Sequence, residues 1–255
     1  MNGRQDLVTS VAIENQTHNT SSVETAMFFC LPVKVGQRRG NESIPIINAV
    51  LIAVNILVFL FPEAVTGSSH LILSTVAYCF VHTGFWHLFC NMWVLWIFGN
   101  RVNRRLGNFW YAIVYLGSAV IIGVLLRLLL RIEVFGASGA VFAVVAVCLI
   151  LMPGIMIEVL CVALFPLSLL VALFSKPSHW VYWLIRFGRF RIKALWCLFI
   201  LPALEILGLF WWGWNWTNLG HLLGLVCGVG AVLVLPRYIS MGNALRSGQL
   251  SYELD

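Results

Sequence analysis

Residues 136–154 read GASGAVFAVVAVCLILMPG: a serine among small residues, then an apolar run that stops at a Pro-Gly pair. A second stretch, GHLLG at residues 220–224, places a histidine among glycines at the start of another apolar run. A serine and a histidine at membrane depth are costly unless they have partners, so each marks a potential functional site. Together, Ser138 and His221 indicate a nucleophile and its base that face each other inside a helix bundle.

The composition is that of a membrane protein. Hydrophobic residues make up 60% of the 255-residue chain and charged residues only 10%, whereas soluble globular proteins carry roughly a quarter charged residues. The net charge of +6 does not indicate nucleic-acid binding, because the basic residues follow membrane topology. The seven cysteines show no metal-ligand spacing and are predicted to act as small hydrophobic residues in the membrane. No metal or organic cofactor is implied.

Six apolar stretches predict an all-α polytopic membrane protein. Apolar runs of about 20 residues are long enough to span a bilayer as helices. The predicted spans cover residues 44–61, 84–99, 109–130, 137–152, 194–212 and 219–235. Because proline interrupts helical hydrogen bonding, Pro62, Pro153 and Pro236 are expected to end the first, fourth and sixth spans.

The distribution of basic residues predicts the orientation. With the N-terminus inside, 14 of the 16 Lys and Arg residues fall in cytoplasmic segments, and only Arg127 and Arg131 fall outside. Because Lys and Arg collect in cytoplasmic loops, we expect a cytoplasmic N-terminus. Residues 1–43 then form a polar, mobile cytoplasmic tail, residues 44–236 the membrane domain and residues 237–255 a cytoplasmic C-terminal tail.

The stretch 155–193 is ambiguous. Residues 155–174 are apolar enough to span, and residues 180–193 are aromatic and basic. Ser138 and His221 both stand near the starts of their helices, so they meet only if these helices run parallel, which needs an odd number of crossings between them. The fifth predicted span alone satisfies this condition. We therefore expect an interfacial or re-entrant segment on the cytoplasmic side; a seventh span is the alternative.

Glycine spacing predicts close packing of the fourth and sixth spans. Glycines flank both reactive residues and recur on one face of the sixth span, at Gly136, Gly139, Gly220, Gly224 and Gly228. Small residues let helices approach closely, which would bring the Ser138 hydroxyl within hydrogen-bond reach of His221. A helix that begins at Ser138 also points its free N–H groups and positive dipole end at the site.

A second polar cluster opens the second span. His87 and Asn91 are four residues apart and share one helix face. Both side chains can donate hydrogen bonds to a developing oxyanion, although a His–Asn pair that holds helices together is the structural alternative. His82 is predicted to be structural, with hydrogen bonds that pin the preceding loop.

These motifs, in this order, resemble the rhomboid family of intramembrane serine proteases. The resemblance covers residues 44–236 and implies a six-helix bundle. It rests on His82, His87 and Asn91, then Phe98-Gly99 and Leu106-Gly107, then Gly136-Ala137-Ser138-Gly139, and finally Gly220-His221 with Gly224.

The resemblance implies roles for individual residues. Ser138 would be the nucleophile and His221 the general base and acid, while His87 and Asn91 would join the Ser138 backbone N–H in an oxyanion hole. Phe142, one turn after Ser138, falls where the family places an aromatic ring against the histidine.

The catalytic pair is expected to be a dyad without an acidic member, because no Asp or Glu stands near Ser138 or His221 in the sequence. Glu205 lies inside the fifth span with no evident partner. Asn103 stands where the family often has an acidic residue, so a weaker anchor for the outer loop is expected.

The function implied is that of an intramembrane serine endopeptidase whose substrates are single-span membrane proteins in the lipid bilayer. The topology suits a bacterial inner membrane with the active site open to the non-cytoplasmic side, and an organelle membrane is the alternative. Two other classes stay open: an inactive rhomboid-like protein that binds membrane clients in quality control, and a transporter or channel. A transporter would show inverted repeats, and the sequence shows none.

Overall fold

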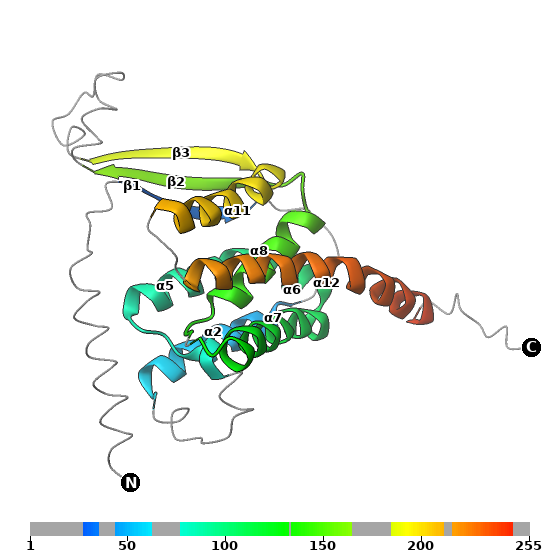
Figure 1. Ribbon diagram of the computed structural model, residues 1–255. Helices are drawn as coiled ribbons and strands as arrows, with labels where there is room; N and C mark the ends of the chain where they lie inside the picture. The colour runs from blue at the N-terminus through cyan, green and yellow to red at the C-terminus, as the bar shows by residue number, and fades with distance from the viewer. Residues whose placement is uncertain are drawn as a thin grey trace, which may run out of the picture. The chain divides into compact units, whose positions relative to one another are not determined.

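Helices dominate the computed structural model, which describes residues 28–35, 44–62, 77–132, 134–164, 185–211 and 216–246 (Figure 1). The helices are α2 (Ile46–Leu60), α5 (Phe85–Val94), α6 (Asn100–Leu106), α7 (Asn108–Gly123), α8 (Ser138–Leu151), α11 (Ala194–Trp211) and α12 (Trp216–Arg246). Three short turns accompany them: the 3-10 turn η1 (Tyr78–Phe80) and the π-helical turns η2 (Leu95–Gly99) and η3 (Val124–Leu129). η2 joins α5 to α6, and η3 extends α7.

Each of the six predicted spans overlaps a helix, and the predicted span 84–99 is divided between α5 and η2. α2 ends just before Pro62, and α8 ends just before Pro153. The last apolar span ends at Leu235, as predicted, but Pro236 does not end the helix, because α12 continues to Arg246. Proline removes one backbone donor, but residues 237–241 contain no further helix breaker, so the helix resumes beyond it.

Two helical segments, Asn108–Arg127 and Trp216–Leu235, are long and apolar enough to cross a membrane, judged by length and composition within the described residues. Three shorter apolar helices, Ile46–Leu60, Ser138–Leu151 and Ala194–Gly208, accompany them. Large apolar side chains of α2, α5, α7, α11 and α12 are exposed on the surface of the bundle, as expected where lipid replaces water.

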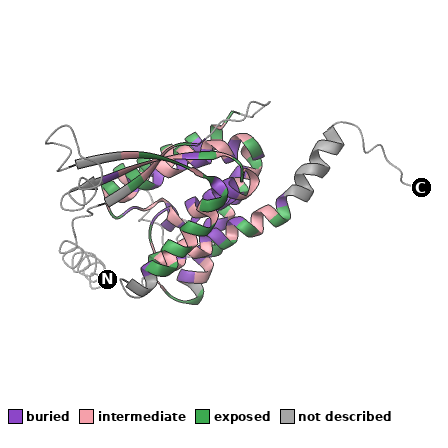
Figure 2. Ribbon diagram, turned by 90° about the horizontal axis from the view of Figure 1, so that it is seen from above, coloured by how far each residue is buried: buried purple, intermediate pink, exposed green. Residues whose placement is uncertain are grey.

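α8 is the central helix of the bundle. Its residues from Gly139 to Leu149 are buried except Phe142, which is half-buried. α8 contacts α5, α6, α7, α11 and α12, and a helix that is apolar all round belongs in such a position. Figure 2 shows the buried residues in purple along the inner helices. The burial of α8 places its first residue, Ser138, among neighbouring helices.

A buried polar network ties α2 to α6 and α7. The fully buried Asn48 side chain accepts from the Tyr111 hydroxyl, and its amide donates to the Leu95 carbonyl at 3.1 Å. Asn103, also fully buried, accepts the Asn48 backbone N–H at 3.0 Å and donates to the Asn108 side chain at 2.9 Å. Asn103 therefore anchors the starts of α2 and α7. The weaker anchor expected for the outer loop concerns residues 63–76, which lie outside the described residues.

The fold is mostly helical, as predicted, but a three-stranded sheet with the order β1-β2-β3 accompanies the helices. The strands are β1 (Phe28–Val35), β2 (Met156–Leu164) and β3 (Ile185–Lys193). β3 alternates basic Arg189, Arg191 and Lys193 with apolar Phe190 and Ile192, which is the period of a strand. The described part of stretch 155–193 is thus extended and not a spanning helix. Residues 165–184 lie outside the described residues.

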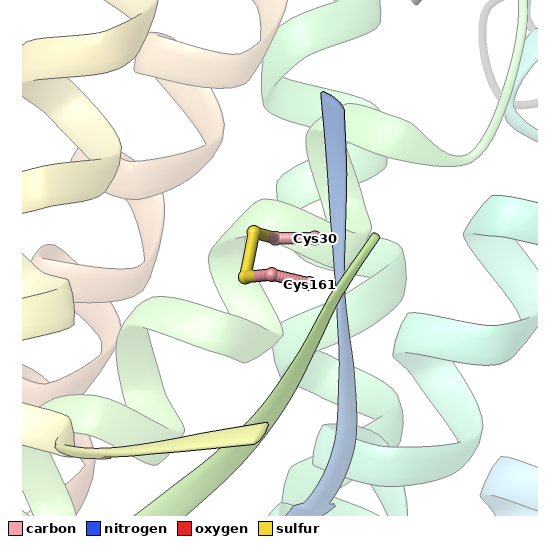
Figure 3. The surroundings of a disulfide bond; sticks show 2 residues. All are labelled: Cys30 and Cys161. Carbon is pink, nitrogen blue, oxygen red and sulfur yellow. A yellow bond between two sulfur atoms is a disulfide. The ribbon is translucent and has the colours of Figure 1, made fainter. Parts of the chain in front are cut away.

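A disulfide joins two of these strands. Cys30 of β1 is bonded to Cys161 of β2 (Figure 3). The prediction that all cysteines act as small hydrophobic residues is therefore wrong for this pair. The predicted mobile tail also contains an ordered segment, because β1 lies within residues 1–43.

The chain divides into two compact units by its internal contacts. One unit consists of Pro32–Glu158 with Arg191–Asp255 and contains the helices; the other consists of Met1–Leu31 with Val159–Phe190 and contains the disulfide. All residues of the candidate site belong to the helical unit.

Candidate active site

α8 and α12 pack together through small residues and run in the same direction. A Cβ atom added at Gly224 would overlap the Gly139 carbonyl, and one added at Gly228 would overlap the Ala143 carbonyl. An advance of four residues along α12 thus matches an advance of four along α8, which defines parallel helices in register. The expectation of two parallel, glycine-lined helices is confirmed.

His221 lies against α8 one turn after Ser138. Its ring stacks on Phe142, with ring centroids 4.2 Å apart and an interplanar angle of 4°. The aromatic ring expected against the histidine is therefore present. The stack fixes the plane of the imidazole on the face of α8 that begins with Ser138.

His87 lies against the backbone that leads into α8. A Cβ atom added at Gly136 would approach His87 Nε2 to 2.7 Å, and Gly136 has a φ of +105°. A side chain at this position is thus excluded both by the imidazole and by the left-handed backbone. His87 Nδ1 is 3.2 Å from the Thr83 hydroxyl. When Thr83 donates this hydrogen bond, the proton of His87 is on Nε2, the nitrogen next to Gly136.

His82 connects the loop before α5 to the start of α8. Its Nδ1 is 3.2 Å from the Phe80 carbonyl, and its Nε2 is 3.5 Å from the Ala137 backbone N–H. These contacts are satisfied by a neutral ring with its proton on Nδ1. The side chain is buried, and burial lowers the pKa of His82 to about 4, with a smaller contribution from the charge of His87.

Residues at the start of α8 line a cavity of about 270 Å³. Its lining brings together Ser138 and His87 from distant parts of the sequence, with Gly136, Gly139 and Gly220 between them. Tyr78, Thr83, Phe135 and Trp216 are also among the residues that line it. Polar and small residues at the N-terminal end of a central helix thus enclose a space next to the serine.

The Asn91 side chain forms a hydrogen bond within its own helix, α5. It is buried, and its amide donates to the His87 carbonyl at 3.0 Å. The cavity lining includes His87 but not Asn91. The structure therefore brings His87 and Ser138 to one cavity and places Asn91 one turn further along α5.

Ser138 and His221 are neighbours without a direct bond. In the part of the chain that the structure describes, no hydrogen bond joins the Ser138 hydroxyl to the imidazole. Catalytic hydrogen bonds are often long in unliganded enzymes and tighten when substrate binds. The parallel packing and the stack on Phe142 are the observations that bring the two residues together.

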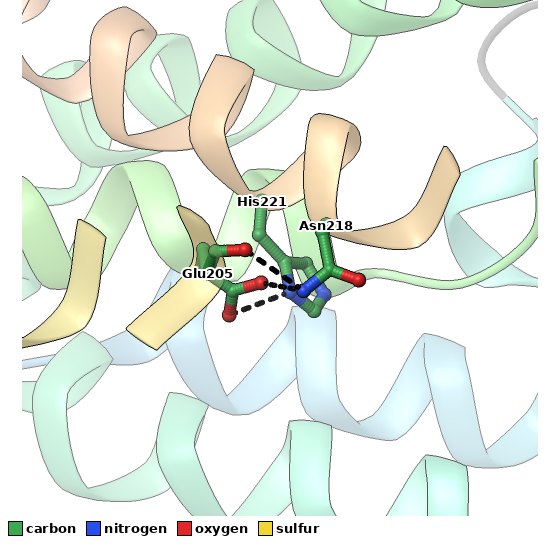
Figure 4. Close-up of polar contacts among 3 residues, drawn as sticks. All are labelled: Glu205, Asn218 and His221. Atoms are coloured by element: carbon green, nitrogen blue, oxygen red, sulfur yellow. Dashed lines mark hydrogen bonds and ion pairs between the residues drawn. The ribbon is translucent and has the colours of Figure 1, made fainter. Parts of the chain in front are cut away.

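The expectation that no acidic side chain lies near His221 is wrong, as is the view that Glu205 has no partner. Glu205 Oε1 of α11 is 3.0 Å from His221 Nδ1, and Glu205 Oε2 accepts from the Asn218 amide at 2.7 Å (Figure 4). The sequence separation of 16 residues between Glu205 and His221 hides this contact, because the two residues belong to different helices.

No group of three or more His, Cys, Asp or Glu side chains is placed to hold a metal ion within the described residues. The side chains described around the site are a hydroxyl, three imidazoles and a carboxylate.

Comparison with known proteins identifies the class. The family model of the Rhomboid domain matches residues 69–238, about two thirds of the chain. The protein therefore belongs to the rhomboid family, whose members are integral membrane proteins with a helical polytopic fold and include both serine proteases and inactive homologues. A search of curated proteins finds no match to this chain.

Proposed function

We propose that this protein is an intramembrane serine endopeptidase that cleaves transmembrane segments of single-span membrane proteins. The observation that carries the proposal is the parallel α8–α12 seam, which sets His221 on Phe142, one turn from Ser138. Ser138 itself lines the cavity. Ser138 acts as the nucleophile, and His221 acts as the general base and acid.

The chemistry is acyl transfer. The Ser138 oxygen bonds to the scissile carbonyl carbon, and its proton passes to His221. His221 then protonates the leaving amine as the C–N bond breaks, and water activated by His221 hydrolyses the acyl-enzyme. The oxyanion of each tetrahedral intermediate is held by the Ser138 backbone N–H at the start of α8 and by His87 Nε2–H. Asn91 is the third donor, once its amide turns from the His87 carbonyl.

Water reaches the site from the end of the bundle where α8 begins. α8 has 14 residues, which corresponds to about 21 Å at the helical rise, shorter than the hydrocarbon core of about 30 Å. The serine then lies below the membrane surface and above the midplane. The substrate helix enters laterally past α11, and helix-weakening residues near its scissile bond let it unwind.

The positive-inside distribution supports a cytoplasmic N-terminus in a bacterial inner membrane, with residues 155–193 on the cytoplasmic side. The active site then opens to the non-cytoplasmic side, because the segment that leads into Ser138 carries only Arg127 and Arg131, whereas the other 14 basic residues lie in segments assigned to the cytoplasm.

A fluorophosphonate probe tests the proposal. We expect the purified wild-type protein to be labelled and to cleave a single-span reporter in liposomes. Ser138→Ala should lose both activities, and His221→Ala should lose cleavage, because removal of a nucleophile or its base costs on the order of 10⁶-fold in kcat. Ser118→Ala is the matched control, since Ser118 is a buried serine of α7 and its loss should leave labelling intact.

A second candidate is an inactive homologue that binds membrane clients. The absence of a hydrogen bond between Ser138 and His221 in the described chain favours it. Failure of the folded wild-type protein to react with the probe, together with retention of a co-purifying single-span client, would establish this role and refute the protease.

A further inference from the structure

Glu205 occupies an unfavourable position for a carboxylate. It lies inside α11, and its neighbours Leu204 and Ile206 are 58% and 45% exposed on the outer surface of the bundle. The Glu205 side chain itself is only 15% exposed. Acidic side chains in membrane-spanning segments are costly and face the bundle interior where they have partners. The side chains that contact Glu205 therefore indicate its role.

Each carboxylate oxygen of Glu205 has a partner on α12. Oε1 faces His221 Nδ1 at 3.0 Å, and Oε2 accepts from the Asn218 amide at 2.7 Å. Asn218 and His221 are three residues apart on α12, so one helix face presents both partners to α11 (Figure 4). A hydrogen bond from Nδ1–H to a carboxylate fixes the tautomer of a histidine and leaves Nε2 as the proton acceptor.

We propose that Glu205 is a positioning residue that converts the Ser138–His221 pair into a triad. This inference rests on the proposed function, since a triad is meaningful only if Ser138 is the nucleophile. Glu205 holds the proton on Nδ1, so that Nε2 is free to take the proton of Ser138. The Glu205 carboxylate also faces the imidazolium that forms during the reaction. Phe142 fixes the ring plane, and Glu205 fixes the rotation within that plane.

Asn218 determines the orientation that a glutamine side chain would adopt at position 205. The Asn218 amide nitrogen lies 2.7 Å from Glu205 Oε2 and 3.4 Å from the Glu205 backbone carbonyl. Two acceptors hold its NH₂ group toward Glu205. In Glu205→Gln the new side chain must therefore turn its oxygen toward Asn218 and its NH₂ toward His221 Nδ1. The histidine then carries its proton on Nε2 and cannot accept one from Ser138.

The first test is kinetic, with a single-span reporter in liposomes. Glu205→Gln should lower kcat on the order of 10⁴-fold, as expected when the catalytic histidine is held in the wrong tautomer, with KM changed less than about threefold. Glu205→Gln combined with Asn218→Ala should recover kcat at least tenfold over Glu205→Gln alone, because the amide oxygen can then turn to Nδ1–H. Asn218→Ala alone should cost far less than Glu205→Gln.

A structural role alone would make the double variant worse than either single variant. That result, or a Glu205→Gln enzyme within tenfold of the wild-type kcat, would overturn the proposal. Glu158→Gln is the matched control, since Glu158 pairs with Arg191 at the sheet and its loss should leave kcat unchanged.

The second test does not need activity. ¹⁵N NMR of histidine-labelled protein at alkaline pH, with His221 assigned by its loss in His221→Asn, reports which ring nitrogen carries the proton. We expect Nδ1–H in the wild-type protein and Nε2–H in Glu205→Gln. An Nε2–H tautomer in the wild-type protein would refute the triad even if Glu205→Gln failed to fold. An Nδ1–H tautomer in a protein that neither cleaves nor reacts with fluorophosphonate would leave the Glu205 contact standing and refute the protease.

Discussion

His82 and Glu205 show how much depends on single side chains in this bundle. His82 was recognisable from the sequence because it stands in a short polar segment before an apolar run, and its hydrogen bonds to Phe80 and Ala137 join that segment to α8. Glu205 was visible as an isolated acid, but its role was not. Which face of α11 meets which face of α12 depends on packing that no local sequence pattern encodes. The contact between Glu205 and His221 could therefore not be predicted from the sequence.

The depressed pKa of His82 predicts a specific loss of stability in acid. Its folded-state pKa of about 4 lies below the ordinary value of about 6.5, so the unfolded chain binds the proton first. The contribution of the neutral ring is complete above about pH 6.5 and is lost progressively as the pH falls toward 4. Thermal unfolding in detergent at pH 7 and pH 5 measures this loss.

The control for this prediction is His82→Gln, whose amide can donate to Phe80 and accept from Ala137 without titrating. The fall in melting temperature from pH 7 to pH 5 should be smaller in this variant than in the wild-type protein. Equal falls in the two proteins would show that His82 does not cause the acid sensitivity.

At the scale of elements, the α8–α12 seam could be predicted because glycine spacing at four-residue intervals has one helical meaning. The sheet was missed because apolar membrane sequence hides strand periodicity. Residues 156–164 contain one charged residue, Glu158, so their alternation is weak. Residues 180–193 are aromatic and basic, a composition that is typical of an interfacial segment and does not by itself indicate a strand. Pro236 does not end α12, because a single proline removes one backbone donor and the residues after it continue the helix.

The seam predicts which glycines tolerate a methyl group. Gly224→Ala and Gly228→Ala would push a Cβ atom into backbone carbonyls of α8, which cannot move aside as a side chain can. We expect each to lower the free energy of unfolding by about 1–3 kcal/mol, the usual cost of overpacking, and to reduce cleavage by displacing His221. Thermal unfolding and the reporter assay measure the two effects.

Gly220→Ala is the matched control within the same helix. Its Cβ atom would meet only Leu126 Cδ1, at 3.8 Å, an ordinary contact. This variant should unfold at the wild-type temperature or slightly above it, since alanine favours helices over glycine by about 1 kcal/mol. A loss of stability as large as that of Gly224→Ala would contradict the seam as described.

At the scale of the whole molecule, two features disagree on which side of the membrane the N-terminus lies. The basic residues favour the cytoplasm, by 14 against 2, whereas the bond between Cys30 and Cys161 persists only in an oxidising compartment. The charge distribution sums over every loop of the chain, and the disulfide depends on one pair of residues. We therefore give the charges more weight.

This assignment predicts that the Cys30–Cys161 disulfide forms only once the protein has left the reducing cytoplasm, so that both residues are free thiols in bacterial cells that express it. A permeant maleimide should alkylate both residues in intact cells, and an impermeant maleimide should alkylate neither, as read by mass spectrometry of the peptides. Recovery of the two peptides as a cross-linked pair without reductant would place the N-terminus outside and invert the topology.

The contact between Glu205 and His221 has a consequence for the order of events during a reaction cycle. The carboxylate belongs to α11 and the imidazole to α12, so any outward swing of α11 that admits a client also takes the proton holder away from the base. The outward position of α11 and the Glu205–His221 contact that prepares Ser138 are then mutually exclusive. Under the proposed function, cleavage therefore follows the return of α11, and transmembrane helices that leave before α11 returns are not cut.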